Sequence, residues 1–259
     1  HSADVGCLES ETKRSVGKKW GEVWSEGCDT MYGMWKEEAD RRAPYIPYKR
    51  VIPESKRYTD YVGSVVAGSD IYAIKKGHVD APTIVRIDSE GKEHRISSFA
   101  YTASDLKWDA ASERLYWSES MPDERWSLKS DSKIRYMKGA NGIKKTLKNK
   151  ALLYNPAQNA EKTASVRYYP DGHSSLNLTS SEDGKTMESY DAPDSLQLVE
   201  TAWIGDNIYV TAISDNGYGI YRLLSKEGKW SEVLAPQPVM IKDFRTYGNE
   251  LVFTCDRTG

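Results

Sequence analysis

The residue types that catalyse reactions are present in this 259-residue sequence, but not at the spacings that common catalytic motifs require. The four histidines stand at positions 1, 78, 94 and 173, so no pair has the HExxH spacing that presents two imidazoles to a zinc ion. No GxSxG segment is present for a nucleophilic serine. Thr179 stands where a phosphate-binding loop ending in Gly184-Lys185-Thr186 would need glycine. We therefore expect no catalytic residue, no metal site and no cofactor within these residues.

Ionisable and aromatic residues do gather in short polar segments, which lie between stretches of alternating apolar and polar residues. The longest combines the acid Asp123, the guanidinium Arg125 and the indole Trp126, a mixture suited to sugars, peptides or a protein surface. Two others contribute His173 and Asp215. These five residues are candidates for the rim of a binding face. The alternative is that Asp, Asn and Gly occupy these segments because they favour turns and bond their own backbone.

The alternating segments repeat along the C-terminal four fifths of the chain. The second strand of each repeat is expected to begin at Ile71, Leu115, Ala164, Ile208 and Leu251, which gives spacings of 44, 49, 44 and 43 residues. Polar turns rich in Gly, Asp and Asn separate the strands. A period in the forties with four short strands per repeat is typical of β-propeller blades. The sequence therefore predicts an all-β fold, a β-propeller with four complete four-stranded blades and a partial fifth.

An apolar or small residue marks an inner strand shortly before each second strand. These residues are Val65, Trp108, Ala157, Trp203 and Phe244. Glu200 lies three residues before Trp203 on such a strand, so we expect it to point into the central channel. A solvated carboxylate is the better interpretation of Glu200 than a catalytic one, because general acid catalysis needs a positioned partner that spacing does not establish.

A propeller avoids exposed strand edges by closing its ring, yet the fifth repeat stops at Gly259 after two strands. We therefore expect a longer, six-bladed parent protein, or a ring completed by the rest of the parent chain or by another copy. The expected domains are a helical segment with its linker over residues 1–47 and a partial propeller over residues 48–259.

The helical segment shows apolar residues at steps of three and four, which places them on one face of an amphipathic helix. The face comprises Val16, Trp20, Val23, Trp24, Gly27, Met31, Met34 and Trp35. We expect one helix, or two separated near Gly27, capped by Ser10 or Thr12 and ended by Pro44. We expect the tryptophan face to pack against the chain's own sheets; docking of a partner is the alternative.

The repeats resemble the TolB-like, WD-like propeller repeats of bacterial envelope proteins, whose units read as a tryptophan, a polar turn and an alternating strand. Residues 203–210, WIGDNIYV, follow that order. Residues 251–259, LVFTCDRTG, are similar to the FTSDRTG stretch of those repeats, with Cys255 in place of Ser. The usual Ser-Pro-Asp-Gly turn is degenerate: residues 109–112 and 155–158 stand where it is expected.

This resemblance implies an exported protein, periplasmic or at the cell surface. Large proteins of Bacteroidetes that look like this sometimes join a metallopeptidase-like domain to such a propeller. The preferred interpretation is a non-catalytic binding module whose loops on one face meet a protein, a peptide or a glycan. The alternative is an accessory propeller that gates substrate for a larger, peptidase-like hydrolase with its catalytic domain outside this sequence. A third interpretation is a glycan-processing propeller with paired carboxylates at the channel.

The composition limits the remaining partners. Lys and Arg total 36 against 38 Asp and Glu, for a formal charge of -2, so no charge excess favours nucleic acid. No apolar run reaches the roughly 18 residues of a membrane-spanning helix. Cys7, Cys28 and Cys255 lack CxxC spacing and are expected to be incidental thiols, with a bridge between the first two as the remaining possibility.

Overall fold

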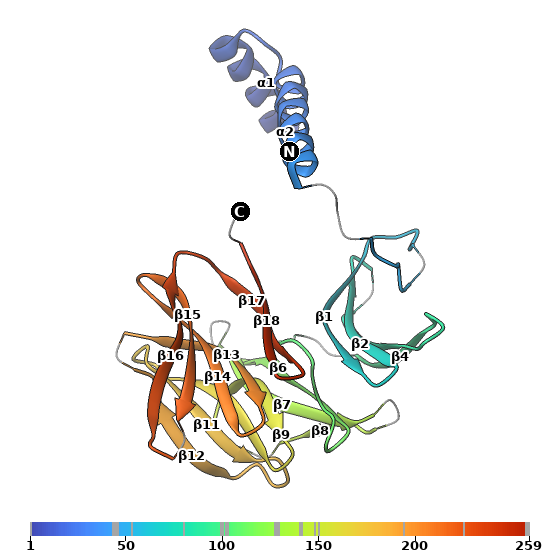
Figure 1. Cartoon of the computed structure of the whole chain (residues 1–259). Helices are drawn as coiled ribbons and strands as arrows, with labels where there is room; N and C mark the ends of the chain where they lie inside the picture. Colours follow the sequence, from blue (N-terminus) through green and yellow to red (C-terminus); the bar gives the residue numbers. More distant parts are fainter. Residues whose placement is uncertain are drawn as a thin grey trace. The chain divides into compact units, whose positions relative to one another are not determined.

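The computed structural model describes residues 2–42, 47–52, 54–79, 81–98, 101, 104–126, 130–139, 142–147, 149, 151–193, 195–224 and 226–256, with side chains from residue 8 onward. The chain divides into two compact units, residues 1–50 and residues 51–259. Each unit has its own secondary structure, helical in the first and all strands in the second (Figure 1).

The helical unit contains α1 (Ser2–Val16) and α2 (Trp20–Arg42). The expectation of a break near Gly27 is wrong, because the chain leaves the helix at Gly17, which has a φ of 75°, and α2 runs through Gly27. A single glycine costs a helix only about 1 kcal/mol, so it does not end one by itself. The helical segment also begins at Ser2 rather than at Ser10 or Thr12. No α2 side chain is buried, and packing of its tryptophan face against the sheets stays a prediction.

The second unit consists of five antiparallel sheets, four of them four-stranded and the last two-stranded, as the repeat predicts. Sheet 1 holds β1 (Thr59–Ala67), β2 (Asp70–Gly77), β3 (Thr83–Ile87) and β4 (Glu93–Ser98); sheet 2 holds β5 (Lys107–Asp109), β6 (Arg114–Pro122), β7 (Ser130–Lys138) and β8 (Lys145–Thr146). Sheet 3 holds β9 (Leu153–Asn159), β10 (Lys162–Tyr168), β11 (Ser174–Ser180) and β12 (Thr186–Asp191). Sheet 4 holds β13 (Gln197–Ile204), β14 (Asn207–Ser214), β15 (Gly217–Leu224) and β16 (Lys229–Gln237), and sheet 5 holds β17 (Ile241–Tyr247) and β18 (Glu250–Cys255).

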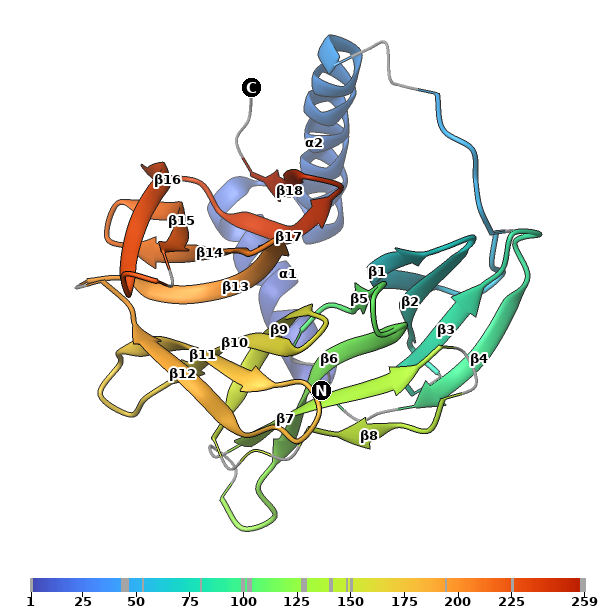
Figure 2. The same ribbon diagram turned by 60° about the horizontal axis from the view of Figure 1, so that its bottom comes forward.

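The five sheets are arranged around a common centre, each a meander in chain order. Figure 2 shows β1, β5, β9, β13 and β17 innermost and β4, β8, β12 and β16 at the periphery. This is the arrangement of propeller blades. In a propeller the turns between second and third strands emerge on the same side as the connections between sheets. We call that side the loop face.

The hydrophobic core lies between neighbouring sheets rather than within any one of them. Leu176 and Val166 of sheet 3 pack with Leu198 and Val210 of sheet 4 in one buried cluster. Further clusters join sheets 1 and 2, sheets 2 and 3, and sheets 4 and 5. Each sheet is therefore buried on the faces that meet its neighbours, and this packing holds the inner strands at fixed positions around the centre.

Of the two segments where a Ser-Pro-Asp-Gly-like turn is expected, residues 109–112 contain a turn and residues 155–158 do not. Asp109 ends β5 and accepts hydrogen bonds from the backbone amides of Ala111 (3.3 Å) and Ser112 (3.2 Å), which fixes the β5–β6 turn. Residues 155–158 instead lie within β9. The prediction of a turn there is wrong, because the bulge that Asn155 introduces keeps the strand paired with β10 on either side.

The structure describes the side chains of two of the three cysteines. Cys28 and Cys255 are free and exposed, so Cys28 does not form the bridge considered above. The Cys7 side chain lies outside the described residues, as do Pro44 and the segment 257–259. None of the described helices combines the length and the apolar character that spanning a membrane requires.

Candidate binding face

Bulges in four inner strands aim polar residues at the centre of the ring. The pairing register of β1, β9, β13 and β17 with the next strand is interrupted at one point in each. Gly63, Asn155 and Asp243 lie at three of these points and have φ values of 57°, 49° and 53°. Asn and Asp adopt this left-handed conformation more readily than other residues with a side chain. Glu200 lies in the fourth bulge, between Leu198 and Thr201.

Asn155, Glu200 and Asp243 border a cavity of about 380 Å³, which we call the axial cavity. Its lining comes from all five sheets or from the segments leading into them and comprises Val62, Ile74, Lys76, Ser104, Asp105, Lys107, Asn155, Val199, Glu200, Lys242 and Asp243. Most lie near the beginning of an inner strand, just after a connection between sheets. The axial cavity is therefore at the loop face, and Glu200 lies in its wall.

Lys107 connects sheets 2, 4 and 5 at the axial cavity. Its Nζ donates a hydrogen bond of 2.5 Å to the carbonyl oxygen of Phe244 and lies 3.9 Å from Glu200 Oε2. The same Glu200 oxygen accepts a hydrogen bond of 3.2 Å from the Phe244 amide. Burial lowers the pKa of Lys107, against the opposing effect of the Glu200 carboxylate. Burial also raises the pKa of Glu200, although Lys107 favours its ionised form.

Arg245 has the corresponding role between sheets 5 and 1. Its Nη1 donates a hydrogen bond of 2.5 Å to the Ser64 carbonyl, and its Nη2 lies 3.5 Å from Asp105 Oδ2 and 3.4 Å from Asp243 Oδ1. Burial raises the pKa of Asp105, while Lys107 and Arg245 act in the opposite direction. Both cations thus donate to main-chain carbonyls, and three carboxylates border the same space.

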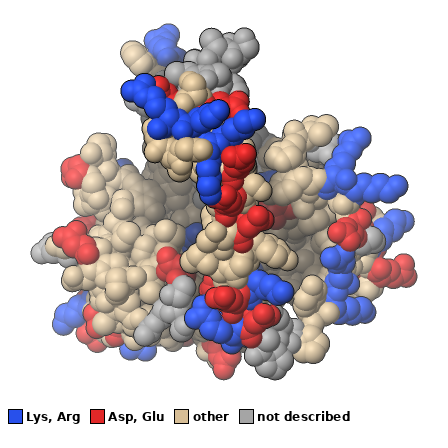
Figure 3. All heavy atoms as spheres, turned by 90° about the horizontal axis from the view of Figure 1, so that it is seen from above, with Lys and Arg blue, Asp and Glu red and all other residues tan. Residues whose placement is uncertain are grey.

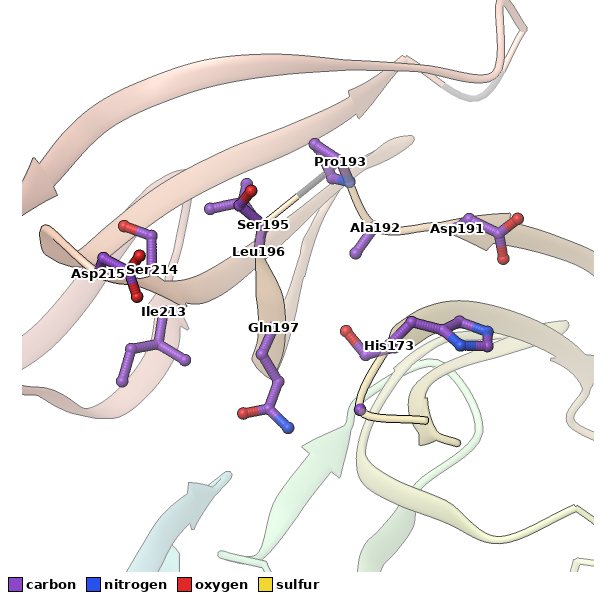
Figure 4. A pocket seen from close by; sticks show the side chains of 12 residues that line it. His173, Asp191, Ala192, Pro193, Ser195, Leu196, Gln197, Ile213, Ser214 and Asp215 are labelled. Carbon is purple, nitrogen blue, oxygen red and sulfur yellow. The ribbon is translucent and has the colours of Figure 1, made fainter. Parts of the chain in front are cut away.

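A second and larger pocket, of about 640 Å³, lies between sheets 3 and 4 (Figure 4). We call it the rim pocket. It is lined by three connections on the loop face: Gly172 to Ser174, Asp191 to Pro193 with Ser195 to Gln197, and Ile213 to Asp215. Ser174 is buried and its Oγ accepts a hydrogen bond of 2.9 Å from the Leu198 amide, which joins the two sheets beneath the pocket. His173 and Asp215, two of the five candidates for the rim of a binding face, therefore line one pocket.

The His173 ring is held by its neighbours in the β10–β11 turn. Its Nδ1 is hydrogen-bonded to Asp171, and this bond lowers the pKa of the Asp171 carboxyl. The ring stacks on Tyr169 with centroids 3.9 Å apart and planes 11° apart. Arg167 lies 4.4 Å from the Tyr169 centroid, which completes a small stack beside the pocket.

The other predicted residues are not brought into either cavity. Asp123 Oδ1 accepts hydrogen bonds from the backbone amides of Arg125 (2.9 Å) and Trp126 (3.0 Å), as the turn-forming interpretation expects. Trp126 is 63% exposed. These three residues form an exposed turn on sheet 2, at the end of β6.

The sequence analysis missed Asp105, Lys107, Asn155 and Asp243. The sequence contains a signal for them, because a polar residue stands one to three positions before each apolar or small residue that marks an inner strand. Glu200, three positions before Trp203, is an example. The bulges that turn these residues inward have no such signal, since they depend on the pairing of each strand with its neighbour.

The charged residues of both signs are interspersed over the side of the molecule shown in Figure 3, without an extended surface of one sign. This agrees with the near-neutral composition. Recognition on the loop face must therefore depend on the local charges of its cavities rather than on a general field.

No protein-family model matches the chain, and no curated protein sequence matches it. In structure it is similar to a puromycin-hydrolysing peptidase from Mycobacterium tuberculosis, with a TM-score of 0.56 and 12% identity over 75% of this chain and 33% of the peptidase. It is also similar to TolB from Acinetobacter baumannii, with a TM-score of 0.51 and 11% identity over 72% of this chain and 48% of TolB. The chain thus matches about a third and about half of the lengths of these proteins. At these identities the likenesses concern the fold, and they confirm the TolB-like propeller that the repeats predict.

Proposed function

We propose that the propeller is a non-catalytic binding module that holds a peptide segment of a partner protein on its loop face, with the axial cavity receiving a basic side chain or an amino terminus. The observation that carries this proposal is the convergence of five sheets on one cavity bordered by Asp105, Glu200 and Asp243. A ligand ammonium or guanidinium group would meet three carboxylates, of which Glu200 and Asp105 are only 23% and 31% exposed, so ion pairs with them are stronger than between fully exposed groups.

Four cations lie at or beside the cavity: Lys76 and Lys242 are exposed, and Lys107 and Arg245 are engaged by the protein itself. Lys107 and Arg245 each donate a 2.5 Å hydrogen bond to a main-chain carbonyl, so they hold neighbouring sheets together. The shifts in the pKa of Lys107 and Glu200 follow from burial, which structural ion pairs show as well as catalytic ones. We therefore favour binding over acid–base catalysis at this pair.

The test is to pan a phage-displayed random peptide library against the full chain and to measure the affinity of the selected peptides by calorimetry. We expect the selected peptides to share a Lys, an Arg or a free amino terminus. We expect Glu200→Gln and Asp243→Asn each to weaken binding about tenfold, because each removes a charge partner from a partly buried pair. The matched control is Glu227→Gln, since Glu227 is exposed in the β15–β16 turn.

Selected peptides without a basic group, or with equal affinity for all these variants, would contradict the proposal. An accessory role in a larger peptidase-like hydrolase remains the alternative assignment for the same cavity. It would be favoured if the parent protein cleaved the selected peptides and Glu200→Gln impaired that cleavage. Export to the periplasm or cell surface, and completion of the ring by the parent chain or another copy, belong to this proposal as well.

A further inference from the structure

The rim pocket is separate from the axial cavity and differs from it in size and lining. The two cavities share no lining residue, and the rim pocket is the larger at about 640 Å³ against about 380 Å³. Strand β13 passes from one to the other, with Gln197 in the rim pocket and Glu200 in the axial cavity. Three residues of strand span about 10 Å, so both cavities could be occupied at once.

The two carboxylates of the rim pocket lie at its two ends. Figure 4 shows His173 and Asp191 at one end and Asp215 with Ser214 at the other. Between these ends lie Pro193 and Leu196, both partly buried, together with the exposed Ser195 and Gln197. A ligand that fills the pocket must therefore offer hydrogen-bond donors at its ends and both apolar and polar groups in its middle.

The charges of the pocket exclude anionic ligands. Neither Asp191 nor Asp215 forms an ion pair with any residue that the structure describes. Ionised carboxylates only accept hydrogen bonds, so the ligand must donate to both. A phosphate, sulfate or carboxylate group would instead meet like charge. A compact cation would reach one of the two carboxylates, because they lie at opposite ends of the pocket.

The ring of His173 adds a flat, rigid surface at one end. Its stacking on Tyr169 and its bond from Nδ1 to Asp171 fix the ring, and the side chain is 49% exposed. Nε2 is the ring nitrogen left to meet a ligand hydroxyl. Sugar rings combine the two properties that this pocket requires, hydroxyl groups around the edge and C–H groups on the faces.

We propose that the rim pocket binds a neutral saccharide, with hydroxyl groups donating to Asp191 and Asp215 and a ring face packed on Leu196 and Pro193. This site is independent of the peptide site proposed at the axial cavity. A single partner carrying both a peptide and a sugar would engage both sites on the loop face.

The experiment is a glycan array probed with the full chain, followed by calorimetry with the best neutral trisaccharide. The array carries triacetylchitotriose, cellotriose, maltotriose and mannotriose beside uronic, sulfated and amino-sugar oligosaccharides. We expect binding to neutral sugars only. We expect Asp215→Asn and Asp191→Asn each to weaken it about tenfold, because each replaces a charged acceptor with a neutral one. His173→Ala should also weaken it, and its far-ultraviolet spectrum and melting temperature check that the fold is retained.

The axial variant Glu200→Gln separates this proposal from the previous one, because it should bind the trisaccharide as the wild type does while losing peptide affinity. Three outcomes would overturn the saccharide site. These are an array with no neutral sugar bound, preference for anionic sugars, and equal affinity of the wild type, Asp215→Asn and Asp191→Asn. Binding of basic peptides that is lost in Asp215→Asn but kept in Glu200→Gln would assign the pocket to a cation instead.

Discussion

Replacing Lys107 by Met should destabilise the propeller substantially, because this residue joins three sheets at the axial cavity. The substitution keeps most of the aliphatic volume and removes the charge. Phe244 loses the donor to its carbonyl, now 2.5 Å away, and Glu200 loses the cation at 3.9 Å. The Lys107 and Glu200 side chains are only 16% and 23% exposed, so water replaces the lost interactions incompletely.

The magnitude follows from these contacts. Removing one partner of a buried ion pair costs about 3–5 kcal/mol. The pair here is long and borders a cavity that water can enter, so we expect about 2–4 kcal/mol, including the unsatisfied carbonyl. For a domain of this size that corresponds to a decrease in melting temperature of roughly 4–16 °C. The decrease in unfolding free energy caused by Lys107→Met should be smaller in acid, because protonation of Glu200 and Asp105 removes the negative charge that Lys107 no longer compensates.

The assay is urea unfolding followed by tryptophan fluorescence. Lys229→Met is the matched control, because Lys229 lies 3.8 Å from Glu227, nearly the same separation, but both side chains are more than 60% exposed. We expect the control to change the free energy of unfolding by less than about 0.5 kcal/mol. A Lys107→Met loss no larger than that of the control would refute the claim that Lys107 holds the inner strands together.

Three further predictions concern the inner strands and their charges. Gly63→Ala should lower the free energy of unfolding by about 2 kcal/mol or more, because the added Cβ would lie 2.9 Å from Asp105 Oδ1. The control Gly68→Ala has a similar positive φ but open space around it, so it should cost only about 1 kcal/mol. Equal urea midpoints for the two variants would contradict this prediction. Asn155→Ala should lower the melting temperature more than Asn155→Gly. Both variants lose the 2.5 Å hydrogen bond from Asn155 Nδ2 to the Val199 carbonyl, but only alanine keeps a side chain at a φ of 49°. The reverse order of melting temperatures would contradict backbone strain at this position. Burial raises the pKa of Glu200 above its ordinary 4.5, so the contribution of this proton equilibrium to stability is present in acid and is lost as the pH rises through the folded-state pKa. The unfolding free energy of Glu200→Gln should therefore increase relative to that of the wild type as the pH rises. A constant difference between the two proteins from about pH 4 to 7 would contradict the pKa shift.

The blade pattern was predictable because it rests on local signals. Alternating residues place one face of each strand against a neighbouring sheet, and Gly, Asp and Asn supply the conformations of tight turns. The five second strands that the spacing identified are β2, β6, β10, β14 and β18. The helix boundaries were less predictable, because one glycine at position 27 is tolerated within α2 while Gly17 ends α1.

The candidate site was predictable only where topology alone decides the location. Glu200 follows from its place on an inner strand, and His173 and Asp215 follow from the rule that their turns share one side of the propeller. The pairing of Lys107 with Glu200 joins residues 93 positions apart through the packing of three sheets, which no local pattern records. Asp123 shows the opposite case, since its place in a turn is explained by bonds to its own backbone.

Photo-crosslinking tests most directly whether the axial cavity receives the ligand. A selected peptide carrying a benzophenone next to its basic residue is irradiated on the full chain, and the crosslinked residues are mapped by mass spectrometry. We expect crosslinks at the residues of β13 and β17 that line the axial cavity, 199–200 and 242–243, and a loss of these crosslinks with Glu200→Gln. Crosslinks confined to the helical unit, or to the turn at residues 205–206 at the far end of β13, would contradict the account.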